Sequence, residues 1–211
     1  MTGKSLQKRI ALWKRQKTRL LVLAGKRKAG KDVFIEHVMR NYPGFKHYRF
    51  AQAPDLIAKI LELPIERRIQ QALFGVNALL YPMLGEAAYK RRVAKLVDRE
   101  KPKLAIIESA RTKEEYEEFV IKRKGILIGF KADDKIRYER ALKDRGRSRR
   151  QDENRMSFRK FMSKERLNIE KDIDWIVKQS HIVVENNFSS PKPFYLQIDR
   201  VMKELGFKKR K

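Results

Sequence analysis

The sequence predicts an α/β fold of three layers, in which a parallel sheet of five strands lies between two layers of helices. Five short apolar segments alternate with segments of helical periodicity, which is the order expected when crossover helices join parallel strands. The 211 residues are 42% hydrophobic, enough for one buried core. No repeat or long linker divides the chain. We therefore expect one domain over residues 20–207, with a basic arm at 1–19 and a basic tail at 208–211.

The expected strands, in chain order, are Leu20–Ala24, His47–Ala51, Lys103–Glu108, Gly125–Lys131 and His181–Asn186. Helices are expected at Val33–Asn41, Pro54–Leu61, Ile65–Phe74, Glu86–Glu100, Lys113–Arg123, Asp133–Arg145 and Pro193–Leu205, with a long one from Phe158 to Ile169. Residues 1–19 carry seven Lys or Arg and no acid. They are interpreted as a basic arm or a short amphipathic helix, either outside the core or lying across it.

A glycine-rich loop follows the first expected strand and precedes the first helix of the domain. It reads GKRKAGK and fits the pattern G-x-x-x-x-G-K in the strand–loop–helix context that supports a P-loop. Its glycines let successive N–H groups turn toward a phosphate, and the helix N-terminus adds positive charge. Lys31 is expected to contact the β- and γ-phosphates of ATP. The loop residues expected to bind the nucleotide are Gly25, Lys26, Arg27, Lys28, Ala29, Gly30, Lys31 and Asp32.

The magnesium site is expected to be unusual. Asp32 stands where the common pattern has Ser or Thr, and its carboxylate can ligate Mg²⁺ directly or through water. Glu108 ends the third expected strand and is the second candidate ligand. Arg111 follows it and is a candidate to grip an acceptor phosphate with both guanidinium nitrogens. The alternative is that Glu108 and Arg111 only cap the helix that follows.

Arginines in and after the fourth crossover helix are candidates for stabilising the transferred phosphate. Phosphoryl transfer spreads negative charge over the moving group, and cations that close over it lower the barrier. Arg137 and Arg140 are the catalytic candidates. The arginine-rich segment at about 145–157 is expected to be a mobile lid that excludes water. A nucleic-acid-binding loop is the competing interpretation of that segment.

Several motifs together resemble P-loop nucleotide kinases, in particular deoxynucleoside monophosphate kinase and dephospho-CoA kinase-like proteins. They are the P-loop, RFA-x-A-P at 49–54, ADDKIRYERALKDRG at 132–146, MSF at 156–158 and VVENN at 183–187. The P-loop is also similar to that of animal phosphomevalonate kinases, which carry Asp after the lysine. The resemblance implies a nucleotide-kinase sheet, Mg-ATP as donor, and Arg137 and Arg140 at the base of the lid. It further implies that Asn186 and Asn187 lie near the donor base.

Two departures from this family fall on the acceptor side. The relatives usually carry Asp-Gly-x-Arg after the third strand, where this chain has Glu108-Ser109-Ala110-Arg111. They also carry a basic residue just after the proline, where this chain has Asp55 and Leu56. The acceptor is therefore the part of the function that the sequence defines least.

The charge of the chain points to a second class of function. Lys and Arg number 52 against 26 Asp and Glu, a formal net charge of +26, so the surface should attract polyanions such as RNA or DNA through the basic arm and lid. The absence of cysteine excludes disulfides and thiolate chemistry, and the three histidines lack ligand spacing and are interpreted as structural. No apolar run reaches the ~18–20 residues that span a bilayer, so we expect a cytoplasmic protein with no membrane partner.

The leading hypothesis is a kinase that moves the γ-phosphate of ATP to a small phosphorylated acceptor, with a (deoxy)nucleoside monophosphate as first candidate. Dephospho-CoA or phosphomevalonate phosphorylation is the nearest enzymatic alternative. A nucleic-acid-associated ATPase and a protein that holds nucleotide without turnover are the alternatives from other classes. No feature of the sequence indicates an oligomeric state.

Overall fold

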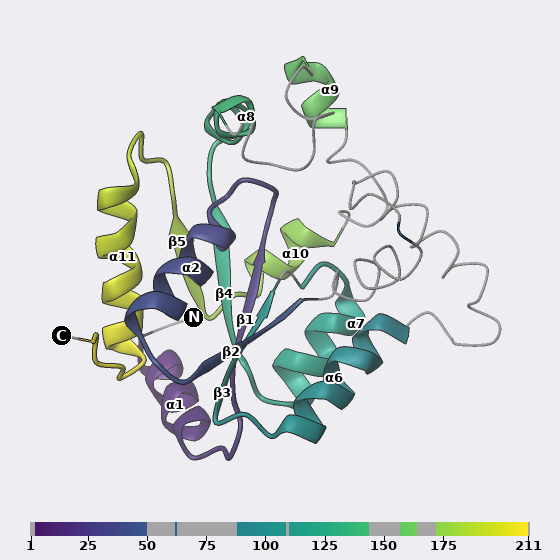
Figure 1. Ribbon diagram of the computed structural model, residues 1–211, viewed down its shortest axis with the longest axis vertical. Helices are drawn as coiled ribbons and strands as arrows, with labels where there is room; N and C mark the ends of the chain where they lie inside the picture. The colour runs from purple at the N-terminus through teal and green to yellow at the C-terminus, as the bar shows by residue number, and fades with distance from the viewer. Residues whose placement is uncertain are drawn as a thin grey trace.

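A parallel five-stranded sheet runs through the centre of the molecule (Figure 1). The computed structural model describes residues 3–49, 62, 88–108, 110–143, 157–163 and 172–210. Within these residues the strand order is β2-β3-β1-β4-β5, and all four neighbouring pairs are parallel. The strands are β1 (Arg19–Gly25), β2 (Phe45–Arg49), β3 (Leu104–Glu108), β4 (Ile126–Lys131) and β5 (Ile182–Glu185). The predicted parallel α/β fold is confirmed.

Two layers of helices cover the sheet, because strand residues of alternate parity point to opposite faces. Leu21 and Leu23 of β1 lie in one core, whereas Leu20, Val22 and Ala24 lie in the other. The first core is covered by α1 (Gly3–Lys14), α2 (Lys31–Asn41) and α11 (Pro191–Glu204). The second is covered by α6 (Ala88–Glu100), α7 (Lys113–Tyr116), η1 (Glu117–Lys122) and α10 (Ile173–Lys178).

The N-terminal helix α1 lies across the core, which is one of the two placements that the sequence left open. Ile10 and Trp13 are buried, and Trp13 Nε1 donates a 3.0 Å hydrogen bond to the carbonyl of Leu20. The Trp13 ring also meets Phe207 edge-on, with 6.0 Å between centroids. The apolar face of α1 is therefore part of the domain. Lys8 and Lys14 are exposed, whereas Arg9 is partly buried and donates to the carbonyls of Val120 and Gly125.

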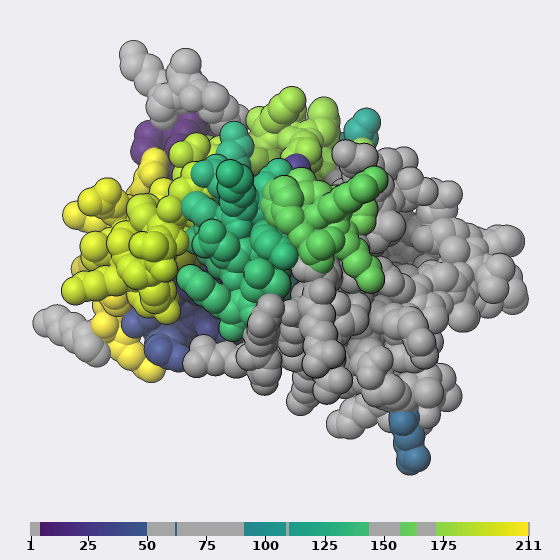
Figure 2. Space-filling model, turned by 90° about the horizontal axis from the view of Figure 1, so that it is seen from above, coloured from purple at the N-terminus to yellow at the C-terminus, as the bar shows by residue number. Residues whose placement is uncertain are grey.

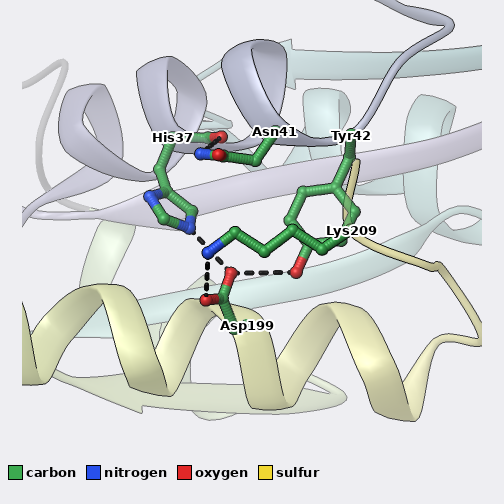
Figure 3. Close-up of polar contacts among 5 residues, drawn as sticks. All are labelled: His37, Asn41, Tyr42, Asp199 and Lys209. Carbon is green, nitrogen blue, oxygen red and sulfur yellow. Dashed lines mark hydrogen bonds and ion pairs between the residues drawn. The ribbon is translucent and has the colours of Figure 1, made fainter. Parts of the chain in front are cut away.

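The basic tail is held against α2 and α11 by the cluster in Figure 3. Asp199 of α11 accepts hydrogen bonds from Tyr42 Oη at 2.9 Å and from Lys209 Nζ at 2.7 Å, and it lies 2.7 Å from His37 Nε2. The backbone N–H of Arg210 donates to the carbonyl of Asn41 at 2.8 Å. These contacts fix the C-terminal tail beside the end of α2.

Some elements differ from their predicted form. The helix expected at 113–123 is a short α-helix followed by a π-helix, in which Arg123 N donates to Glu118 O five residues back. The wider π turn lets the consecutive residues Phe119 and Val120 both be buried. The strand β2 begins two residues before its predicted position, since Phe45 pairs with Leu104 and enters the core, and its predicted end at Phe50 and Ala51 lies outside the described residues. The helix α10, which is only six residues long, was not predicted.

Several predicted segments lie outside the described residues. They are the helices at 54–61 and 65–74, the lid except its last residue Ser157, and the end of the helix at 158–169, of which α9 (Phe158–Ser163) is described. In the described parts of the chain no helix has the length and apolarity needed to cross a membrane.

Candidate nucleotide-binding site

The predicted P-loop joins the end of β1 to the start of α2 at the carboxyl edge of the sheet. Gly30 has φ 111°, a left-handed conformation that L side chains rarely adopt. A Cβ atom at this position would also collide with the side chains of Asn186 and Phe194. The second glycine of the motif is therefore required for both the backbone conformation and the close packing of the loop.

Lys31 is the first residue of α2 and is almost fully buried. Its ammonium group donates to the carbonyls of Gly25 at 2.6 Å and Lys26 at 3.0 Å. The lysine thus holds the two arms of the loop together, with its charge at the N-terminus of a helix, where anions are stabilised. Asp32 follows in the first turn of α2 and is exposed.

Two arginines of α8 (Asp134–Lys143) hold the P-loop from the side. Arg137 is fully buried and donates to the carbonyl of Arg27 at 3.0 Å and to Asp134 Oδ1 at 2.6 Å. Arg140 donates to the carbonyl of Lys28 at 3.2 Å. These contacts make both arginines positioning residues for the loop. Their predicted direct contact with the transferred phosphate stays a prediction.

The segment after β5 completes this arrangement. Arg140 Nη2 lies within 3.0 Å of Asn186 O, Asn186 Oδ1 and Phe188 O, and burial lowers the pKa of this arginine. Asn186 Nδ2 in turn donates to the carbonyl of Ala29 at 3.1 Å. Asn187 Oδ1 accepts from the backbone N–H of Asp133 at 2.8 Å, which ties this segment to the start of α8. Seen from above the sheet, α8 lies between α11 and α9 (Figure 2).

A pair that the sequence did not predict lies where β3 ends, between β3 and the neighbouring strand β2. Glu108 ends β3, and its Oε2 is 2.7 Å from Nε2 of His47 on the neighbouring strand β2. Arg49 Nε is 3.5 Å from the same oxygen. Burial alone would raise the pKa of Glu108, but the His47 hydrogen bond and the charges of His47, Arg49 and Lys31 together lower it. Glu108 is therefore an ionised carboxylate within the field of the P-loop lysine.

The interpretation of His47 as an ordinary structural residue missed this pair. The alternation of β2 is only a partial signal, because it places His47 and Arg49 on one face of the strand while the strand order decides that this face meets Glu108. His47 lies between Phe45 and Arg49 on one face of the strand, and Arg49 is in register with Glu108. Two residues of the same strand thus reach the carboxylate at the end of its neighbour.

Arg111 lies beyond the end of β3 and is exposed. Its backbone N–H donates to Glu115 Oε2 at 2.6 Å, next to the capping box that Thr112 and Glu115 form at the start of α7. The backbone at Arg111 thus contributes to the helix cap, as the alternative interpretation expected. Contact between the Arg111 side chain and an acceptor phosphate stays a prediction.

The residues fit a magnesium nucleotide complex. Mg²⁺ that bridges phosphates needs only one or two carboxylates from the protein. Glu108 is ionised, and Asp32 lies next to the buried lysine in the first turn of α2. Among the described residues no three His, Cys, Asp or Glu side chains gather into a cage for a metal ion. The phosphates themselves would therefore supply the remaining ligands.

No protein-family model and no curated protein sequence matches the chain. Solved structures do resemble it. A shikimate kinase from Bacteroides thetaiotaomicron superposes with a TM-score of 0.56 at 12% identity, covering 89% of this chain and 98% of that one. This chain has the fold of a P-loop kinase. This chain is also similar to TT1252 from Thermus thermophilus, with a TM-score of 0.53 at 15% identity, covering 89% of this chain and 96% of that one. A dephospho-CoA kinase from Campylobacter jejuni matches less well, with a TM-score of 0.48, 14% identity and coverage of 90% and 98%.

Proposed function

We propose that this protein is a kinase that transfers the γ-phosphate of ATP, with Mg²⁺, to a small phosphorylated acceptor. The observation that carries the proposal is the P-loop itself. Lys31 lies at the head of α2, and Arg137, Arg140 and Asn186 hold the loop backbone through three of its carbonyls. A loop fixed in this way is preorganised for phosphate, which is the main source of rate in phosphoryl transfer.

In the reaction, an acceptor oxygen forms a bond to the γ-phosphorus while the bond from that phosphorus to the β–γ bridging oxygen breaks, and ADP leaves. Lys31 would contact the β- and γ-phosphates and balance the charge that develops on the bridging oxygen. Bound Mg²⁺ would neutralise phosphate charge, held by Asp32 and Glu108. Arg137 and Arg140 would act through the loop by fixing its carbonyls.

A nucleoside monophosphate is the first candidate acceptor. Its phosphate oxygen is already ionised, so the transfer needs no general base. The strands β2 and β3 are neighbours, and Arg49 and Arg111 lie at or just beyond their carboxyl ends. Two guanidinium groups at this edge suit an acceptor that carries a phosphate, because planar guanidinium groups bind phosphate oxygens in pairs. Phosphomevalonate would use the same kind of acceptor oxygen.

The Glu108–His47 pair favours a second candidate, a phosphorylated acceptor whose reactive group is a hydroxyl, such as dephospho-CoA. A hydroxyl must lose its proton as it attacks the phosphorus, and Glu108, with His47 at 2.7 Å, can receive that proton. In this case Asp32 alone would hold Mg²⁺, because one carboxylate is enough when the phosphates supply the other ligands. The two candidates differ in their need for His47. Replacing His47 by Gln should slow transfer to a hydroxyl and leave transfer to a monophosphate almost unchanged.

The test is an ADP-release assay with a panel of nucleoside monophosphates, dephospho-CoA and phosphomevalonate. We expect turnover that depends on one of them and falls by at least ~100-fold in Lys31→Ala. Lys192→Ala, an exposed lysine at the start of α11, is the matched control and should retain activity. ATP binding with no acceptor-dependent turnover would indicate a nucleotide-holding protein, and turnover equal in Lys31→Ala and wild type would overturn the proposal.

A further inference from the structure

The amino edge of the sheet, opposite the P-loop, gathers cations from segments far apart in the sequence. Arg19 N donates to Lys103 O at 3.1 Å, and Gln16 Nε2 lies 3.5 Å from Lys124 O. These bonds join the segment after α1 to the loops before β3 and β4. Because β3, β1 and β4 are neighbours in the sheet, the three segments lie side by side at the bottom of Figure 1. The exposed cations on these three segments and at the last residue of α1 are named the amino-edge cluster. They are Lys14, Arg15, Lys17, Lys101, Lys103 and Lys124.

The amino-edge cluster is not neutralised by the described part of the protein. None of its six side chains forms an ion pair with a described carboxylate. Neighbouring acids have other partners: Glu100 binds Lys46 and Tyr48, while Asp98 binds Arg123. Like charges gathered on neighbouring segments repel one another, so the cluster favours an anionic partner.

The backbone adds an independent observation. Lys101 and Lys124 have φ of 44° and 53°, the left-handed region that favours glycine or asparagine. Each follows a helix, and Lys101 N bonds to Val97 O in the position where glycine commonly ends a helix. A cation near a helix C-terminus gains some stability from the helix dipole, but that gain does not require a lysine at the left-handed position itself. Two lysines thus occupy strained positions in two adjacent loops of the same cluster.

We infer that the amino-edge cluster binds the phosphate backbone of a nucleic acid, at a site separate from the P-loop. Rows of lysine and arginine supply such binding without reading sequence. A membrane surface fits less well, since an interfacial helix needs a free apolar face. In α1 that face is used by the core, where Ile10 and Trp13 are buried. The inference does not depend on the proposed kinase activity.

The first test measures the binding of a labelled DNA duplex of about 20 base pairs by the full chain over roughly 50 to 200 mM salt, with an RNA duplex and single-stranded RNA in parallel. The test variant combines Lys101→Gly, Lys103→Gln and Lys124→Gly. The matched control removes the same charge from exposed residues of α8 and α11, as Lys135→Gln, Lys192→Gln and Arg200→Gln.

We expect the test variant to flatten the plot of log affinity against log salt by about 2 to 3, since each lost phosphate contact contributes about 0.9. The control should change this slope by much less. Equal changes in the two variants, or no binding of the wild type at low salt, would overturn the inference. Binding of anionic phosphatidylserine vesicles with none of any nucleic acid would also overturn it, in favour of a membrane partner.

The unfolding temperature shows whether a weaker binding of nucleic acid comes from loss of the binding site or from loss of the folded structure. The two lysine-to-glycine changes remove left-handed strain, so the test variant should unfold at a temperature no lower than that of the wild type. If it unfolds earlier, the double variant Lys17→Gln, Lys103→Gln, which leaves the helix ends unchanged, repeats the measurement with an expected slope change of about 2. A folded double variant with an unchanged slope would contradict the inference.

Discussion

The two edges of the sheet use basic residues in opposite ways. At the carboxyl edge, the side chains of Lys31, Arg137 and Arg140 are directed into the protein and donate to carbonyls of the P-loop. At the amino edge, Lys17 and Lys103 are exposed and pair with no described carboxylate. The cations behind the net charge of +26 therefore fall into two groups with different structural roles. Part of it builds the loop that is expected to bind phosphate, and part of it is presented to solvent.

The largest effect is expected from Gly30→Ala at the carboxyl edge. The substitution places a Cβ atom at φ 111° and against Asn186 and Phe194, so strain and overpacking add. We expect a loss of about 3 to 4 kcal/mol in the free energy of unfolding, together with loss of ATP binding. Urea unfolding and calorimetric titration with ATP measure the two effects.

Gly44→Ala is the matched control for this prediction. Gly44 has φ 91°, but an added Cβ would meet only Leu104 Cδ1, at an ordinary 3.8 Å. The substitution should therefore cost only the left-handed strain, about 1 to 2 kcal/mol, and leave ATP binding unchanged. Equal costs at the two glycines would show that packing of the loop against Asn186 contributes little.

Arg137→Met tests whether the buried cations of the carboxyl edge hold the loop. The variant leaves the carbonyl of Arg27 without this donor and Asp134 without its cation. Asp134 is half-exposed, which reduces the penalty, so we expect a loss of about 2 to 3 kcal/mol in the free energy of unfolding. ATP affinity should fall as well. Lys135→Met, on the exposed side of the same helix, should change neither quantity, and a similar loss in both variants would contradict the role of Arg137.

More of the structure at the carboxyl edge than at the amino edge could be predicted from the sequence. The motif G-x-x-x-x-G-K defines a local chain geometry, so the P-loop and its lysine could be located directly. The parallel sheet could also be predicted, because each of its five apolar segments and the helices between them is recognised from a short stretch of sequence. The hydrogen bonds from Arg137, Arg140 and Asn186 to the P-loop were not predicted, because the loop carbonyls that they bind lie 110 to 157 residues away in the sequence.

The amino-edge cluster and the Glu108–His47 pair could not be predicted, since both depend on strand order. Lys103 and Lys17 are far apart in sequence and lie at the same edge of the sheet only because Arg19 of β1 pairs with Leu104 of β3. His47 reaches Glu108 only because β2 pairs with β3. The π-helix η1 likewise depends on tertiary burial of Phe119 and Val120, which outweighs the local preference for an α-helix.

His181 predicts a pH dependence that belongs to the amino edge. Its Nδ1 accepts a 2.9 Å hydrogen bond from the N–H of Leu127, which requires this nitrogen to be unprotonated. Burial, with a smaller contribution from the charge of Arg9, lowers the pKa of His181 to about 4. The unfolded chain binds the proton near pH 6.5, so stability is complete above pH 6.5 and is lost as the pH falls toward 4.

The expected loss is about 2 kcal/mol over this pH range, after allowance for the partial exposure of the ring. Urea unfolding at several pH values measures it. His181→Asn offers an amide oxygen in place of Nδ1 and does not titrate, so its curve should lack this component. If wild type and variant lose the same stability between pH 6.5 and 4, the titration must come from other groups.

The smallest effect is expected from Lys101→Gly and Lys124→Gly as single variants, and it has the opposite sign. Glycine relieves the left-handed strain at φ 44° and 53° and ends a helix better than lysine does, although the favourable contact with the helix dipole is lost. Each variant should gain about 0.5 to 1 kcal/mol in the free energy of unfolding, measured by urea at pH 7. The control is Lys103→Gly, in the same loop as Lys101 but not at a positive φ, which should gain nothing. A loss of stability at Lys101 and Lys124 would mean that these lysines serve the fold, and the contrast between a structural and a solvent-facing set of cations would then fail.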